Sequence, residues 1–182
     1  MQLRGGDPVS SSLSKGVRKA EVSLRWDPSA LGEPAHDLDL VAATYEEQGP
    51  GGSPAYAVHF DSRSPDGTIT LTRDSRTGQG FGADEVMTLE FERLAPVYQR
   101  VVVGVVIQQQ SGRRTFGDIR NVSARVAEGY TELAATDFAA VTGSTAAVVC
   151  EFRRDTTGSW QLAGGLRGFD ADPESFLGVM GG

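Results

Sequence analysis

The feature that most constrains the fold of this chain is a short alternation of apolar and polar residues that recurs along it. Val22, Leu24 and Trp26 alternate with Ser23 and Arg25. Such a period of two puts the apolar side chains on one face, which is typical of a half-buried β-strand. Strands are therefore expected at 21–26, 38–45, 55–60, 68–72, 86–91, 100–108, 120–127, 131–138, 146–153 and 160–167.

The segments between these strands carry turn residues. Ser64-Pro65-Asp66-Gly67 combines a proline and a glycine, each of which favours a turn conformation. One helix start stands out at Asp172-Pro173-Glu174, where a capping residue precedes a proline and an acid. Short strands separated by turns every 8–12 residues or so are typical of sandwiches. The sequence therefore predicts an all-β fold: a two-sheet, mostly antiparallel β-sandwich with few short helices.

Length and composition limit the classes of protein further. The 182 residues suit one domain, expected at 13–182 after a flexible tail at 1–12. A hydrophobic content of 39% is too high for a disordered chain, and no apolar run approaches the ~20 residues of a membrane span. The net charge of -7 argues against nucleic acid binding. One cysteine and two histidines exclude an internal disulfide and most zinc sites. A cytoplasmic location is expected.

The segment 73–85 is an acidic loop rich in glycine. It has carboxylates at both ends and glycines at alternate positions between them, which let the backbone turn tightly. Calcium takes 6–8 oxygen ligands, which carboxylates, hydroxyls and backbone carbonyls of such a loop can supply. The carboxylates are Asp74, Asp84 and Glu85, and the glycines are Gly78, Gly80 and Gly82.

A second acidic pair, Asp37 and Asp39, opens the strand expected at 38–45, with both carboxylates on one face. Asp61 follows another expected strand. With Asp74, Asp84 and Glu85, the pair would bring five negative charges together, and one divalent ion would reduce them to three, two ions to one. Magnesium fits less well, since it retains waters and needs few carboxylates, and transition metals prefer histidine or cysteine.

Two familiar loops can be excluded. Asp74 and Glu85 stand at positions 1 and 12 of an EF-hand spacing, but Arg76 occupies position 3 and Gln79 the glycine position 6. The alternate glycines are followed by acids, not by the lysine of a phosphate-binding loop. A solvated acidic hairpin loop without a ligand stays open as the alternative.

Several segments together resemble the TerD family, the tellurium-resistance and stress-response domain of bacteria. The resemblance runs in order from residue 13 to about 169. Its segments are LSKG at 13–16, VSLRWDPS at 22–29, DLDL at 37–40, SPDG at 64–67, RDSRTGQGFGADE at 73–85 and FGDIRN at 116–121.

The resemblance implies a β-sandwich that binds calcium, one or two ions, through the two acidic segments and has no established catalytic activity. It also implies partners among other tellurium-resistance proteins, including a membrane-embedded one. The chain departs from the family at Ser75, where the family usually has Asn, and at Ala83, where it has an acid. The ligands implied are Asp37, Asp39, Asp74, Asp84 and Glu85, with Asp61, Ser75 and the carbonyls of Thr77, Gly78, Gly80 and Gly82.

Three hypotheses follow for function. The first is a calcium-binding, non-enzymatic adaptor whose acidic loop is ordered by calcium, with no nucleic acid partner and no direct membrane insertion. The second is an interaction or scaffold module that has lost one or both calcium sites, as Ser75 and Ala83 allow. The third is a hydrolase using a carboxylate pair, for which the sequence offers no positioned base, nucleophile or cofactor motif.

Overall fold

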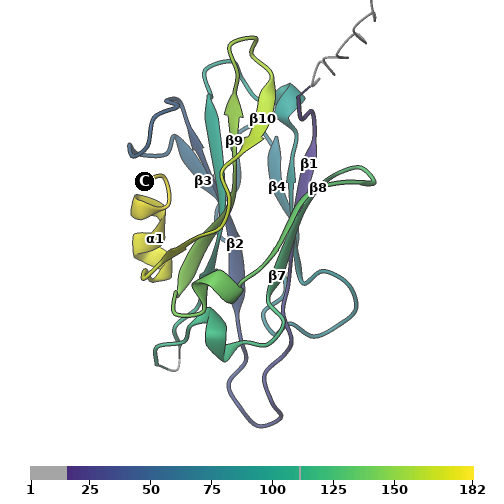
Figure 1. Ribbon diagram of the computed structural model, residues 1–182, viewed down its shortest axis with the longest axis vertical. Helices are drawn as coiled ribbons and strands as arrows, with labels where there is room; N and C mark the ends of the chain where they lie inside the picture. Colours follow the sequence, from purple (N-terminus) through teal and green to yellow (C-terminus); the bar gives the residue numbers. More distant parts are fainter. Residues whose placement is uncertain (1–15, 111) are drawn as a thin grey trace, which may run out of the picture.

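The computed structural model, which describes residues 16–110 and 112–182, contains two antiparallel sheets that face each other (Figure 1). This confirms the predicted all-β sandwich; the tail expected at 1–12 lies outside the described residues. The first sheet has the order β4-β5-β1-β7-β8. Its strands are β1 (Ala20–Arg25), β4 (Ile69–Arg73), β5 (Glu85–Leu89), β7 (Ser123–Glu128) and β8 (Thr131–Asp137).

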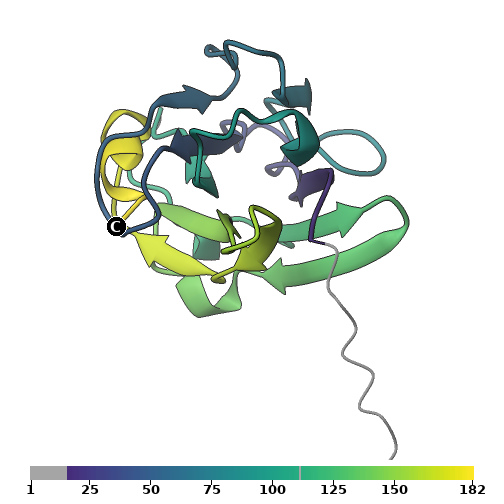
Figure 2. The same ribbon diagram turned by 90° about the horizontal axis from the view of Figure 1, so that it is seen from above.

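The second sheet has the order β10-β9-β6-β2-β3, and β11 also pairs with β9. Figure 2 shows the two layers from above. The main hydrophobic core lies between them and includes the aromatic side chains of Trp26, Phe91 and Phe152. The strands are β2 (Leu38–Tyr45), β3 (Tyr56–Val58), β6 (Arg100–Ile107), β9 (Ala146–Arg154), β10 (Trp160–Ala163) and β11 (Arg167–Phe169).

The apolar strand β6 is covered on both faces. Val101 and Val103 point into the core between the sheets. Val102 and Val106 instead pack with Phe176 of the helix α1 (Pro173–Val179), which lies on the outer face of the second sheet (Figure 1). Burial on both sides explains why β6 reads as a continuous apolar run and does not alternate.

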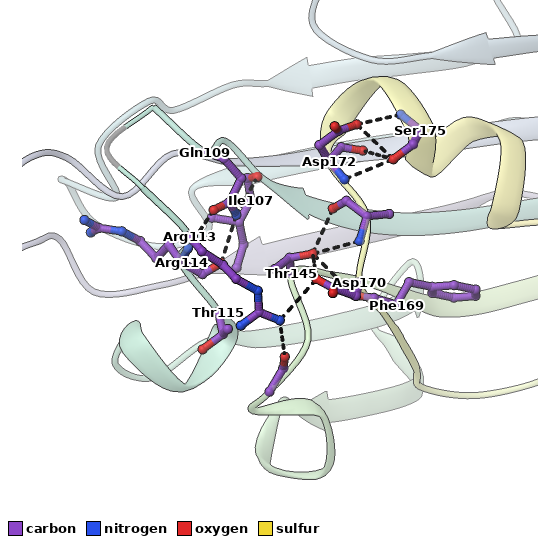
Figure 3. Close-up of polar contacts among 12 residues, drawn as sticks. Ile107, Gln109, Arg113, Arg114, Thr115, Thr145, Phe169, Asp170, Asp172 and Ser175 are labelled. Atoms are coloured by element: carbon purple, nitrogen blue, oxygen red, sulfur yellow. Dashed lines mark hydrogen bonds and ion pairs between the residues drawn. The ribbon is translucent and has the colours of Figure 1, made fainter.

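The helix begins where the sequence predicts. The Asp172 side chain accepts a hydrogen bond from the backbone N–H of Ser175, at 2.8 Å, as Figure 3 shows. Figure 3 also shows Thr145, whose hydroxyl donates to the carbonyl of Ala171 at 2.8 Å and so fixes the segment that leads into α1. Among the described residues, no helix is long and apolar enough to cross a membrane.

The strand boundaries differ from prediction at several places, and three of these differences have a local cause. The strand expected at 160–167 is divided into β10 and β11, because Gly164 adopts a φ of +67° that ends the extended run. Phe91 leaves β5 and begins a 3-10 turn, η1 (Phe91–Arg93), which buries its ring in the core. The strand β7 begins at Ser123, after Asn121 at a φ of 54°. The other 3-10 turns are η2 (Phe116–Asp118) and η3 (Ala139–Val141).

The acidic segments meet at one end of the sandwich. In the antiparallel pairing, Leu24 near the end of β1 and Arg73 at the end of β4 both lie beside the start of β5. The strand β2 begins at the same end, where Leu38 pairs with Ile107. The loops 26–37 and 74–84 therefore extend from this end, in the lower part of Figure 1.

Candidate metal centre

Three carboxylates from three strand ends converge. Asp39 lies in β2, Asp74 directly follows β4, and Glu85 is the first residue of β5. One oxygen of each lies within 4.8 Å of the others. Asp39 and Glu85 are 4% and 0% exposed, whereas Asp74 is exposed. The structure thus gathers two buried acids and one open to solvent.

Glu85 is the most constrained of these acids. Its Oε2 accepts a hydrogen bond from the backbone N–H of Leu40 at 2.6 Å. Its Oε1 is buried and receives no hydrogen bond from any donor among the described residues. Burial, followed by a hydrogen bond shared with Asp74, raises the pKa of Glu85 to about 11. Since an ionised Glu85 would leave Oε1 unsatisfied, this carboxyl needs either a proton or a cation.

Asp37 and Asp39 add to the negative charge at this site. Burial, and then the charges of Asp39 and Asp74, raise the pKa of Asp37 to about 6, although Arg76 opposes the shift. Asp37 Oδ1 is a second buried oxygen without a donor among the described residues. Burial also raises the pKa of Asp39, and the hydrogen bond from Gln108 Nε2 opposes that increase.

A cavity of about 390 Å³ opens onto these acids. Carboxyl, hydroxyl and amide oxygens line it together, so it offers the hard donors that calcium prefers. Its lining includes Asp37, Asp39, Asp74, Arg76, Thr77 and Gln108.

Trp26 locks the two loops of the site together. Its indole N–H donates to the carbonyl of His36 at 3.0 Å, which holds the first loop. Gly78 of the second loop lies against the same indole, at a φ of +74°, and a Cβ there would be 2.5 Å from Trp26 Nε1. Only glycine fits this position on both counts, so the contact fixes the loop beside the acids.

Asp84 belongs to the same loop but faces another way. It is 2% exposed, and its Oδ2 accepts a hydrogen bond from the backbone N–H of Trp26 at 2.8 Å. Burial raises the pKa of Asp84, and this bond from Trp26 opposes the increase. Asp84 lies outside the group formed by Asp39, Asp74 and Glu85.

The remaining predicted ligands are placed in several ways. Ser75 Oγ accepts a hydrogen bond from the backbone N–H of Gly78 at 3.2 Å, so this hydroxyl shapes the loop. Thr77 lines the cavity. Asp61 is exposed, and its backbone N–H donates to the ring of His59 at 3.2 Å. Gly80 and Gly82 are exposed, at φ angles of +113° and +78°.

Two residues at the site were missed by sequence reasoning. Gln108 directly follows the buried strand β6, and its place opposite the start of β2 could have been inferred from antiparallel pairing. The alternation at 22–26 predicts only that Trp26 lies on the apolar face of its strand. A tryptophan at a strand end carries an N–H that needs an acceptor, and this requirement was the signal for its second role.

Chemically, the arrangement suits a hard divalent cation. Two buried carboxyl oxygens, on Asp37 and Glu85, receive no hydrogen bond from the described residues and could act as ligands of a cation. The group of acids that the described residues bring within ligand distance contains no histidine or cysteine, which disfavours the softer transition metals. The side chain of His36 contacts Arg114 instead, and burial followed by that charge lowers the pKa of His36.

Comparison with known proteins identifies relatives over most of the chain. A family model described as the TerD domain matches residues 1–174. The tellurium resistance protein TerD of Alcaligenes sp. is 25% identical over 174 residues, which cover 90% of this chain and 91% of that protein.

Two solved structures share the fold. A Streptomyces coelicolor A3(2) protein, SCO6318, described as a homologue of telluride resistance protein (TerD), is 50% identical with a TM-score of 0.88. A protein of unknown function, SAV2460, is 59% identical with a TM-score of 0.89. Each alignment covers 92% of this chain and 99% of the other.

Proposed function

Because the chain belongs to the TerD domain family, we propose that it is a calcium-binding, non-enzymatic domain of the tellurium-resistance and stress-response type. The observation that carries this proposal is the convergence of Asp39, Asp74 and Glu85 within 4.8 Å around the unpartnered buried oxygen of Glu85. A divalent cation would let Glu85 ionise without leaving that oxygen unsatisfied.

One ion at this cluster is the best-supported stoichiometry. Asp37 borders the same cavity and would supply a fourth carboxylate. A second ion would have to draw on Asp84 and Ser75, whose side chains already accept hydrogen bonds from the backbone. The alternative, a scaffold module without calcium, is favoured by the Ala83 position, which adds no acid to the loop.

The chemistry near the cluster supports a binding role over catalysis. The acids are accompanied by Gln108, Arg76 and Thr77, and no histidine or cysteine lines the described cavity. Cys150 is fully buried, and burial raises the pKa of its thiol, which suppresses nucleophilic reactivity.

In the proposed role, calcium ties the loop 74–84 to the start of β2. The loop is exposed at Asp74 and Gly80, so its order in the absence of an ion depends on few buried contacts. Bound calcium would present an ordered face at this end of the sandwich. Other tellurium-resistance proteins, including a membrane-embedded one, are the proposed protein partners of the domain.

Thermal unfolding tests the proposal. Calcium at 100 times its dissociation constant should add about 2.7 kcal/mol of stability, which corresponds to roughly 5–11 °C for a chain of this length. Magnesium should give a smaller shift, because this site offers more carboxylates than magnesium accepts. Unchanged midpoints in saturating calcium would rule out the site, and calorimetric titration would count the ions.

The variant Glu85→Gln isolates the cluster. Its amide keeps the acceptor for Leu40 N and supplies a donor toward Asp74, so the calcium-free protein should retain its stability. The calcium-induced shift should be lost, because the buried negative charge is gone. Glu92→Gln, at a side chain 50% exposed, is the matched control and should keep the full shift.

A further inference from the structure

Phenylalanine is exposed in this protein only beside the metal centre. The chain has eight phenylalanines, all within the described residues, and six of them are buried or half-buried. The exceptions are Phe60 and Phe81, at 53% and 97% exposure. Leu31, in the loop 26–37, is 105% exposed. Phenylalanine and leucine usually lie inside proteins, so their gathering at one end calls for an explanation.

The backbone itself presents Phe81 to solvent. Its neighbours Gly80 and Gly82 adopt φ angles of +113° and +78°, which other residues rarely take. A Cβ on Gly82 would meet nothing within 4 Å, so the backbone angle, not lack of space, calls for glycine there. The loop thus turns sharply on both sides of a ring that has no cover.

These side chains lie on segments that adjoin the acids. Phe60 lines the same cavity as Asp39 and Asp74. Phe81 and Leu31 belong to the two loops that Trp26 holds together. Both loops extend from the lower end of the sandwich in Figure 1.

This end also carries positive charge, although the chain as a whole has a net charge of -7. Arg63, Arg73 and Arg76 are exposed there. None of the three forms an ion pair with a carboxylate of the described residues. Arg76 opposes the rise that burial causes in the pKa of Asp37 and Asp39, and Arg73 opposes the rise in that of Asp84. These two arginines therefore act on the acids as well as facing solvent, where an anionic surface can meet them.

We propose that, with calcium bound, the tips Leu31 and Phe81 dock this end of the sandwich onto the surface of an anionic phospholipid bilayer. This inference rests on the proposed calcium site. There, the buried unpartnered oxygen of Glu85 is the sign of a missing cation, and Asp74 leaves the ion open to solvent. Headgroup phosphate oxygens would then complete the 6–8 ligands that calcium takes, and the arginines would attract the same headgroups.

A bilayer fits these features better than a protein surface does. A stable protein interface buries about 800 Å² per partner around a contiguous apolar core. Here the apolar side chains stand on separate loops, and the cavity beside Phe60 is lined by carboxylates. Isolated apolar tips can insert between lipid headgroups one at a time, as interfacial anchors do.

Sedimentation with vesicles tests the inference. The full chain should bind phosphatidylcholine vesicles that contain phosphatidylserine in saturating calcium, and should bind neither pure phosphatidylcholine nor either vesicle without calcium. Phe81→Ser and Leu31→Ser should each weaken vesicle binding by about tenfold, since each removes one inserted apolar side chain. Tyr130→Ser is the control, because Tyr130 is 106% exposed at the β7–β8 turn, at the opposite end of the sandwich.

Calcium titration of the same proteins separates the two proposals. Phe81→Ser should bind calcium as the parent does, because the Phe81 ring supplies no ligand. If the parent binds calcium but no vesicle, the bilayer is overturned as the partner and a protein surface takes its place, while the calcium site stands. If the tip variants bind vesicles normally, the proposed role of the loops is wrong. If no calcium binds, both proposals fail.

Discussion

Two regions of this molecule bury carboxylates, and they neutralise them differently. On the second sheet, Arg100 and Glu151 are 1% and 3% exposed and form an ion pair. The same guanidinium donates to the carbonyls of Gly49 and Gly181 and lies 4.7 Å from the centre of the Tyr45 ring. Every part of that buried charge has a partner from the chain.

At the candidate metal centre the chain supplies buried acids without a matching cation. Glu85 and Asp39 receive hydrogen bonds from Leu40 N and Gln108, which are neutral groups. Arg76 lines the cavity but forms no ion pair with a carboxylate among the described residues. The Arg100–Glu151 pair has its counter-ion within the fold, whereas the acids at the other site have none, which is why we propose a binding role for them.

The largest effect on stability should come from breaking the buried ion pair of Arg100 and Glu151. Arg100→Leu should lower the free energy of unfolding by about 3–5 kcal/mol, because it leaves Glu151 buried and short of a partner. Denaturant unfolding measures this, and the loss should be equal with and without calcium. Arg153→Leu is the control: Arg153 Nη2 lies 3.0 Å from the same Glu151 oxygen but its side chain is 43% exposed, so about 1 kcal/mol or less is expected. If calcium restored the stability that Arg100→Leu loses, the two regions would not differ in how their buried acids are neutralised.

The strands and the helix start were predictable because they depend on local patterns. The alternation at β1 and the cap at Asp172 need no knowledge of the rest of the fold. The pairing of Asp39 with the acidic loop was also foreseen, since strand ends bring distant segments together. What could not be foreseen was the direction of each side chain in the loop.

Asp84 and Glu85 illustrate that limit. Both were predicted as ligands from their place in the acidic loop, yet neighbouring residues of an extended chain point to opposite sides. Glu85 reaches across to Leu40 in the facing sheet, whereas Asp84 turns to Trp26 beyond its neighbouring strand β1. Which side faces the cavity depends on how the two sheets pack, and the sequence does not show that packing.

A smaller effect, the change of stability and calcium affinity with pH, should distinguish the candidate metal centre from the Arg100–Glu151 pair. The pKa of Asp37 rises from 3.8 to about 6 and that of Glu85 from 4.5 to about 11, so the folded protein holds protons that the unfolded chain releases. Raising the pH between 5 and 8 should therefore destabilise the calcium-free protein. Calcium must displace these protons, so its affinity should rise about tenfold over that range from Asp37 alone.

Calorimetric titration in calcium-depleted buffers at the two pH values measures this dependence. Asp37→Asn removes one of the two titrating groups, so it should lower the affinity and make the profile shallower by about that tenfold, while the rise that Glu85 causes remains. The parent's loss of stability in calcium-free buffer should disappear in saturating calcium. Equal calcium affinity at pH 5 and pH 8 would mean that the acids are already ionised without calcium. Their burial would then be no argument for a bound cation.

The smallest effect is expected at Asp84. It tests whether Asp84 and its neighbour Glu85 differ in their contribution to calcium binding. Asp84→Asn keeps an oxygen that can accept from Trp26 N, so it loses only the charge on that bond, about 0.5–1 kcal/mol in unfolding free energy. Calcium affinity should fall by less than about threefold, because Asp84 faces β1 and only its distant charge is removed. Calorimetry on Asp84→Asn and Glu85→Gln side by side measures the contrast. If the two variants lose calcium equally, Asp84 turns into the cavity when the ion binds, and its bond to Trp26 belongs to the calcium-free state alone.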